Sequence, residues 1–253
     1  MALQLANAVT DGIRRTVTKT GGILFALLFA TQLLLLAGVN TAVAAQFPPE
    51  VADALGLTLP VSGTVASVLL LGAFLFTAVY FVMVARAFSR PRAELSSFPS
   101  SVYSQRVGRA TLSMLVGGVV VFIAVMIGLV LFIFPGIFLA ASFMFFIFAV
   151  GVEDRGVIGG LKRSWELARG NRLRLGLFVF LVGILGGILG IPSAIFQAAG
   201  APIIGDLVTA LVNSLMFTVI YGIMAAMYVQ LREGDGTGGV SGSQPSPLGQ
   251  TAD

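Results

Sequence analysis

The chain has 253 residues, of which 57% are hydrophobic and only 10% charged, and its mean hydropathy is +0.99. This balance excludes a soluble domain of this size and predicts an integral membrane protein. The sequence contains neither Cys nor His, which excludes disulfides, imidazole catalysis and the common zinc ligands, so we expect no metal and no cofactor. The net charge of +4 is distributed as in membrane proteins, which argues against a nucleic-acid partner.

Residues 3–18 mix apolar and basic side chains in an imperfect amphipathic pattern, which predicts a helix on the membrane surface. A cleaved signal peptide is the alternative, because Val43-Ala44-Ala45 resembles a cleavage site behind an apolar run. The apolar run of 21–45 is longer than the core of a typical signal peptide, which favours the surface helix.

Six apolar segments predict membrane-spanning helices, since roughly 20 helical residues cross about 30 Å of hydrocarbon. The predicted spans are 21–45, 63–88, 112–134, 136–152, 173–191 and 206–231. Pro48 ends the first span, and we expect Pro135-Gly136 to form a tight outer turn. Pro192 is expected to end the fifth span before an outer loop of 193–205. The fold class is therefore an all-α, polytopic membrane protein with cytoplasmic amphipathic helices.

The fifth span is rich in glycine. Gly183 with Gly187, and Gly186 with Gly190, form pairs of small residues four apart that allow another helix to approach closely. We therefore expect this span to be interior.

The charges predict the orientation. With six spans, all 15 Lys and Arg residues fall on the side that holds both termini, whereas the opposite loops carry Glu50, Asp53 and Asp206. The positive-inside rule makes the basic side cytoplasmic, and we expect a multi-pass protein of the plasma membrane. Asp206 is interpreted as the N-cap of the sixth span.

Residues 1–232 form the membrane domain, and 233–253, rich in Gly, Ser and Pro, are expected to be a disordered cytoplasmic tail.

The spans also pair into similar units, each with a basic segment, a span ending at proline, and a return span. Pro48, Pro135 and Pro192 mark the three outer corners. Two interpretations stay open: three internal repeats related by an axis along the membrane normal, or hairpins that converged on one design.

Between the fourth and fifth spans, residues 154–169 predict an amphipathic surface helix. One face is apolar and suits lipid, and the other is charged and suits water. The apolar face carries Val157, Ile158, Leu161, Trp165 and Ala168, and the charged face carries Lys162, Arg163, Glu166 and Arg169. Asp154 is the expected N-cap, Gly170 the expected C-cap, and Asn171 starts the next helix.

The same region carries a family resemblance. With Glu153, Gly156, the run Leu161-Lys162-Arg163-Ser164-Trp165-Glu166-Leu167 and the following Gly170-Asn171-Arg172, it resembles the membrane domain ahead of some glycerophosphoryl diester phosphodiesterases. The N-terminal Gly12, Arg14 and Arg15 and the six-span layout extend this resemblance to all but the tail. It implies a six-span membrane module. It does not imply phosphodiesterase activity, because the separate catalytic barrel of those enzymes uses His and acidic metal ligands, whereas this chain has no His and no room for a barrel.

The densest basic cluster is the first candidate site. Lys162, Arg163, Trp165, Arg169, Arg172 and Arg174 are expected to bind anionic lipid head groups or a partner protein. Generic positive-inside anchoring explains the same cations, and Trp165 is either an interfacial anchor or a lid over a cytoplasmic groove.

Other polar residues suggest little chemistry. Glu153, Asp154 and Glu166 are more simply capping and ion-pairing groups than catalytic or metal-binding carboxylates. No charged residue lies at the bilayer centre, and Asn213 is the best intramembrane polar candidate, with interhelical hydrogen bonding as its structural alternative.

The functional expectation is a non-enzymatic membrane module with no catalytic residues, whose basic cytoplasmic face engages anionic membrane lipids, a partner protein or a second copy of the chain. The alternative is a transporter or facilitator for a neutral or amphipathic solute, which the pairing of spans and the glycines of the fifth span would suit.

Overall fold

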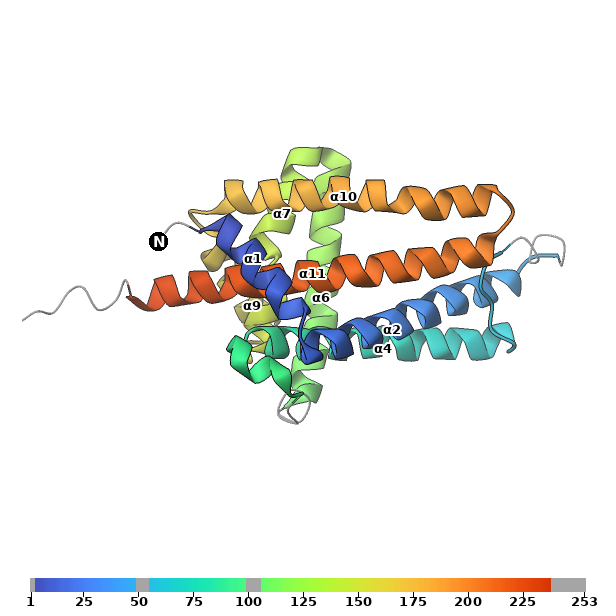
Figure 1. The fold of residues 1–253 in the computed structure, drawn as a ribbon, viewed down its shortest axis with the longest axis horizontal. Coiled ribbons are helices and arrows are strands. Elements are labelled where there is room, and N and C mark those ends of the chain that lie inside the picture. Colours follow the sequence, from blue (N-terminus) through green and yellow to red (C-terminus); the bar gives the residue numbers. More distant parts are fainter. Residues whose placement is uncertain (1–2, 49–54, 99–105, 238–253) are drawn as a thin grey trace, which may run out of the picture.

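In the computed structural model the chain is all α-helical, and the structure describes residues 3–48, 55–98 and 106–237 (Figure 1). The helices are α1 (Leu5–Thr16), α2 (Lys19–Ala44), α4 (Gly63–Phe88), α6 (Val107–Leu131), α7 (Ile133–Phe143), α8 (Phe146–Gly151), α9 (Val157–Ala168), α10 (Arg172–Ala198) and α11 (Pro202–Thr237), with a short 3₁₀ helix η1 (Arg92–Ser96).

Six helical segments in the described part of the chain are long and apolar enough to cross a membrane, which confirms the predicted fold class. They are α2, α4, α6, the combined segment Ile133–Gly151, α10 and Pro202–Gly234. Their mean hydropathies of 1.9 to 2.9 leave no soluble alternative for so large an apolar surface. The chain is therefore a multi-pass membrane protein.

The long helices are arranged in two directions. Helices α2, α4, α10 and α11 lie side by side along the long axis of the molecule, whereas α6 runs across them in the more distant layer (Figure 1). Ala110 and Met114 of α6 pack with Ala78 and Val82 of α4. The three hairpins therefore do not share one arrangement, because α6–α7 crosses the direction that α2–α4 and α10–α11 follow.

The basic side chains of the described residues gather at one end of this layer, which we call the basic end. There α2 and α10 begin, α4 and α11 finish, and α1 lies against α11 (Figure 1). Its cations include Arg15, Arg86, Arg90, Arg106, Arg172, Arg174 and Arg232. The opposite end holds the connections from α2 to α4 and from α10 to α11.

Helix α1 is held by a close backbone approach and by one buried arginine. A Cβ on Gly12 would overlap the main chain of Ile223 in α11, so only glycine fits there. Arg15 is 7% exposed, and its guanidinium donates to the main-chain oxygens of Phe88 and Arg90 at 2.6 and 2.7 Å. These oxygens are at the negative C-terminus of α4, where a cation is favourable.

The expected turn at Pro135-Gly136 is wrong. The turn is the single residue Phe132, with φ −162° and ψ 150°, and Pro135 and Gly136 lie in the first turn of α7. Proline is tolerated in a first helical turn because its missing N–H has no partner there in any case. The predicted fourth span is also interrupted, because α7 ends at Phe143 and α8 begins at Phe146.

The expected end of the fifth span at Pro192 is also wrong, since α10 continues through this proline to Ala198. In place of the predicted outer loop of 193–205, the connection between α10 and α11 comprises only residues 199–201. Gly200 in this connection has a φ of +76°. Proline interrupts helices less in membrane proteins than in water, because the freed backbone groups find other partners. The hydroxyl of Ser193 donates to the main-chain oxygen of Gly190 beside the proline.

Asp206 is not the N-cap of the last helix, because α11 begins at Pro202 and Asp206 is in its second turn. Its buried carboxylate Oδ2 accepts hydrogen bonds from Asn40 Nδ2 and from the Leu57 main-chain N–H, both at 2.8 Å. Asp206 therefore connects α11 to α2 and to the α2–α4 connection.

The expectation that the fifth span is interior is wrong as well. Within α10 only Leu175 and Ser193 are buried, and a Cβ added at Gly183, Gly187 or Gly190 would meet no neighbouring atom. Small residues permit close packing but do not create a partner helix.

Helix α11 extends to Thr237, so 233–237 of the expected tail are helical, and 238–253 lie outside the described residues.

Candidate functional site

Helix α9 lies within the predicted amphipathic segment but buries a different face. Gly160, Ser164, Leu167 and Ala168 are its buried residues, whereas Ile158 of the predicted lipid face is 81% exposed. The Ser164 hydroxyl accepts from the Phe145 N–H at 3.2 Å and donates to the Ser142 main-chain oxygen at 2.9 Å. It therefore satisfies backbone groups at the break between α7 and α8, which explains why a polar side chain is buried there.

The predicted N-cap of α9 is wrong. Gly156 occupies the N-cap position, and Asp154 has a left-handed backbone with φ 52°. The Asp154 carboxylate Oδ2 lies 3.2 Å from Nη1 of Arg106 instead. At the other end, the backbone of Gly170 has φ +84°, the conformation for which glycine is favoured just after a helix.

Glu153 joins three parts of the basic end. Its carboxylate accepts from Arg163 Nε at 3.1 Å, from the Tyr228 hydroxyl at 2.9 Å and from Arg155 Nε at 2.7 Å. Burial alone would raise the pKa of Glu153, but the hydrogen bonds from Arg163, Tyr228 and Arg155 outweigh it and lower the pKa below its usual value. Glu153 is therefore a charged link between the loop before α9, α9 itself and α11.

The cations of the predicted basic cluster have different contacts. Arg163 pairs with Glu153, and Arg174 Nη1 donates to the main-chain oxygen of Leu3 at 2.8 Å. Lys162 and Arg169 are exposed. Two of the predicted cations therefore hold the fold together, and two point to the surroundings.

Trp165 and Arg172 form a stacked pair. The Arg172 guanidinium carbon lies 4.0 Å from the centre of the Trp165 ring and 4.9 Å from that of Phe138. Phe138 and Phe143 pack against the indole, with ring centres at 5.7 and 5.8 Å. Within the described residues, Arg172 Nε and Nη2 are buried without a hydrogen-bond partner, so this cation has unused donors.

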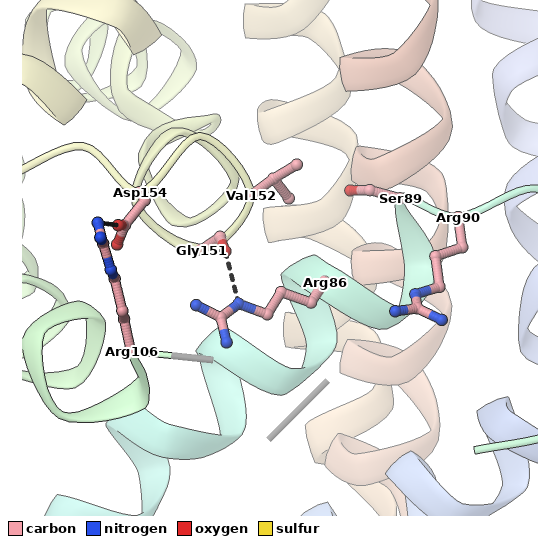
Figure 2. A pocket seen from close by; sticks show the side chains of 7 residues that line it. All are labelled: Arg86, Ser89, Arg90, Arg106, Gly151, Val152 and Asp154. Carbon is pink, nitrogen blue, oxygen red and sulfur yellow. Dashed lines mark hydrogen bonds and ion pairs between the residues drawn. The ribbon is translucent and has the colours of Figure 1, made fainter. Parts of the chain in front are cut away.

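A pocket in the described part of the chain lies elsewhere at the basic end, and sequence reasoning did not predict it. It has a volume of about 570 Å³ and lies between the end of α4, the start of α6 and the loop after α8 (Figure 2). Its lining comprises Arg86, Ser89, Arg90, Arg106, Gly151, Val152 and Asp154. We call it the arginine pocket, because three cations face one carboxylate across it.

The arginines of the pocket are held in different ways. Arg86 Nε donates to the main-chain oxygen of Gly151 at 2.7 Å, and Arg106 reaches the same loop through its ion pair with Asp154 (Figure 2). Arg106 is 74% exposed at its side chain, and Arg90 Nη1 lies 3.6 Å from the Glu94 carboxylate.

Ser89 adds an uncharged group to the lining. Its hydroxyl oxygen is buried and has no hydrogen-bond partner within the ranges that the structure describes. Such a group is costly unless water or a ligand satisfies it. The pocket therefore combines excess positive charge with an unused polar atom, which suits an anion.

Arg86 in the last turn of α4 and Arg90 just after its end are four residues apart, and this spacing was the one available sequence signal for the pocket. Arg106 and Asp154 come from distant segments, so their part in it required the fold. No group of three or more His, Cys, Asp or Glu residues that could hold a metal occurs among the described residues. Asn213 is half-buried on α11 and does not line the arginine pocket.

A family model for a domain of unknown function, DUF7847, matches residues 3–231 of the chain. The match covers all of the helices described above except the last residues of α11. Comparison with the curated proteins and with the solved structures finds no match to the chain.

Proposed function

The chain belongs to the DUF7847 family of domains of unknown function, and we propose that it is a non-enzymatic membrane module that binds anionic lipid head groups at its basic end. The observation that carries this proposal is the arginine pocket, in which Arg86, Arg90 and Arg106 face a single lining carboxylate, Asp154. A lipid phosphate is the anion that a membrane brings to this position in the highest concentration.

The chemistry of the lining suits a phosphate. Guanidinium groups present planar pairs of N–H donors that match phosphate oxygens, and they remain charged even when partly buried. Each cation near an anionic membrane surface contributes about 1 kcal/mol to the attraction. The Ser89 hydroxyl would give the ligand one uncharged hydrogen bond and relieve its own unsatisfied burial.

A second feature supports the same role. Arg172 stacks on Trp165 with two unused donors, and Lys162 and Arg169 are exposed nearby on α9 and after it. An indole beside a cation is typical of the interface between hydrocarbon and head groups. We propose that these residues contact head groups at the rim of the molecule, outside the arginine pocket.

We further propose that the basic end faces the cytoplasm at the plasma membrane, and that the chain is related to the membrane domain of glycerophosphoryl diester phosphodiesterases. The charge distribution supports the orientation, because all 15 Lys and Arg residues precede or follow spans on one side. What supports the relationship is the sequence motif itself, which runs from Glu153 and Gly156 through 161–167 to Gly170-Asn171-Arg172.

The test is retention of lipid by the purified full-length protein. In nanodiscs and detergent, native mass spectrometry should detect bound phosphatidylglycerol in preference to phosphatidylcholine. Replacing Arg90 and Arg106 together by Gln should weaken this binding about 100-fold or more, since two charge-assisted hydrogen bonds at about 1.5–3 kcal/mol each are lost. The matched control is Arg14→Gln with Arg92→Gln, which removes two exposed cations of the basic end outside the pocket.

Equal losses in the two double variants would show general attraction by positive charge without a site. Unchanged retention in the pocket variant would overturn the proposal. Because both double variants lower the net charge by the same amount, only a built pocket separates them.

A further inference from the structure

The α6–α7 hairpin packs against α4 and α10 in the halves of these helices that lie nearer the basic end. Its contacts with α4 involve Ala78 and Val82, which precede Arg86 by eight and four residues. At 1.5 Å per helical residue, these positions are roughly 12 and 6 Å from the level of Arg86. On the other side, Ile137 of α7 lies against Gly176 of α10, two residues beyond Arg174. Both contacts place the hairpin near the basic end.

The halves that a parallel bundle would bring together do not meet. Val68 and Phe74 in the first part of α4 are exposed, as are Phe122 and Val130 in the second part of α6, with Val130 at 81%. In Figure 1, α6 correspondingly leaves α4 sideways and extends past α10 instead of following α4 toward the opposite end. The hairpin is therefore oriented across the long helices along its whole length.

The tip of this hairpin lacks the features of an aqueous loop. From Ala110 to Val152 the sequence has no charged residue, and 129–136 contain no polar side chain at all. Phe132 and Phe134 at the tip are 74% and 86% exposed. The opposite end of the molecule differs, because the α2–α4 connection includes Gln46, and the α10–α11 connection lies between Gln197 in the last turn of α10 and the buried carboxylate of Asp206 in α11.

The backbone of the tip is also suited to hydrocarbon. The Phe132 N–H donates to Gly128 at 3.0 Å, and the Phe132 main-chain oxygen accepts from the Gly136 N–H at 3.4 Å. Pro135 has no N–H to satisfy, and a Cβ on Gly128 would lie 2.9 Å from the Gly136 Cα, so the two helices approach closely. A turn of one residue thus adds almost no loop backbone between the two helices, which keeps the number of polar groups at the tip low.

We propose that the α6–α7 hairpin lies in the leaflet at the basic end, parallel to the membrane plane, with its exposed apolar face against lipid acyl chains. Only α2, α4, α10 and α11 then cross the bilayer. The depth of the contacts, the apolar tip and the one-residue turn carry this assignment, and it does not depend on whether the arginine pocket binds a head group. The partner of this surface is lipid hydrocarbon, since exposed helices without charge are otherwise unstable in water.

The chain has no Cys, so single-cysteine variants of the full-length protein report position directly. In intact cells, a membrane-impermeant maleimide should label Phe47→Cys at the end opposite the basic end and should label Lys162→Cys only after permeabilisation. Phe132→Cys and Phe134→Cys should resist the impermeant reagent in both conditions and react with a lipid-soluble maleimide. Labelling of Phe132→Cys by the impermeant reagent in intact cells would show a spanning hairpin and overturn the proposal. Labelling of Phe132→Cys by the same reagent only after permeabilisation would place the tip in water on the inner side, and would also overturn it.

A depth profile provides the second measurement. Spin labels at the exposed positions 112, 116, 119, 123, 127 and 130 should show constant oxygen accessibility relative to a water-soluble quencher, because an in-plane helix stays at one depth. A spanning helix would change depth by about 1.5 Å per residue and produce a steep gradient, which contradicts the proposal. Dipolar broadening between labels on separate copies would show that a second copy covers the face, and would overturn the assignment to lipid.

Discussion

Arg15 of α1 donates a hydrogen bond to the main-chain oxygen of Phe88, the last residue of α4, at 2.6 Å. The same guanidinium Nη1 reaches the Arg90 oxygen, and Nε pairs with Asp11 at 2.7 Å. One buried side chain thus fixes the N-terminal helix to the end of a membrane-length helix that is 73 residues away in sequence. The contact also holds the backbone from which Arg90 enters the arginine pocket.

Replacing Arg15 by Gln should lower the free energy of unfolding by about 2–4 kcal/mol, because buried carbonyl oxygens lose a charged donor. Thermal unfolding in detergent measures this loss. Arg14→Gln is the control, because Arg14 is the exposed neighbour and carries the same charge. Equal stability of the two variants would contradict the structural role of Arg15.

Gly12→Ala should detach α1 from α11. A Cβ at Gly12 would overlap the Ile223 main chain, and overpacking against backbone costs about 1–3 kcal/mol. Gly22→Ala provides the matched control, since a Cβ there meets nothing within 4 Å and should stabilise α2 by up to about 1 kcal/mol. Limited proteolysis at the N-terminus should become faster in the first variant and not in the second.

The stability of the protein should depend on Glu153 through pH. Its pKa in the folded state is below the ordinary value of 4.5, so its contribution is fully present above that pH and is lost as pH falls through the lower folded pKa. The difference in stability between the wild-type protein and Glu153→Gln should therefore be constant at neutral pH and shrink below about pH 4.5. Denaturation curves at several pH values measure it, with the exposed Glu166→Gln as control. A difference that widens toward acid would refute this sign.

At the opposite end of the molecule, Asp206→Ala should destabilise the connection between α2 and α4. The Leu57 N–H would lose its acceptor and Asn40 Nδ2 would lose one of two, at a cost of about 1–3 kcal/mol. A double-mutant cycle with Asn40→Leu should give a coupling energy of about 1 kcal/mol or more, because the two side chains are in direct contact. Strict additivity would show that the hydrogen bond contributes nothing.

Local patterns were sufficient to predict the helices but not their partners. The predicted span 63–88 has the bounds of α4, because length and hydropathy alone determine where a membrane-length helix can form. Pro192 was misjudged because the rule that proline ends a helix comes from soluble proteins, and α10 continues through it.

The sites needed contacts that no local pattern carries. Asp206 meets Asn40 across 166 residues, and Arg106 meets Asp154 across 48. The register of α9 depended on its neighbours as well, because Ser164 is buried to satisfy a break that the continuous apolar run 136–152 concealed.

The crossing of α6–α7 over the long helices gives the molecule unequal ends. At the basic end, α1, α7, α8 and α9 surround the bundle, whereas α2, α4, α10 and α11 alone reach the other end among the described helices (Figure 1). With the hairpin in one leaflet, as proposed above, such a wedge would displace more lipid from that leaflet than from the other. The leaflet that holds the basic end would then expand and become convex, so many copies together would favour a bent bilayer over a flat one.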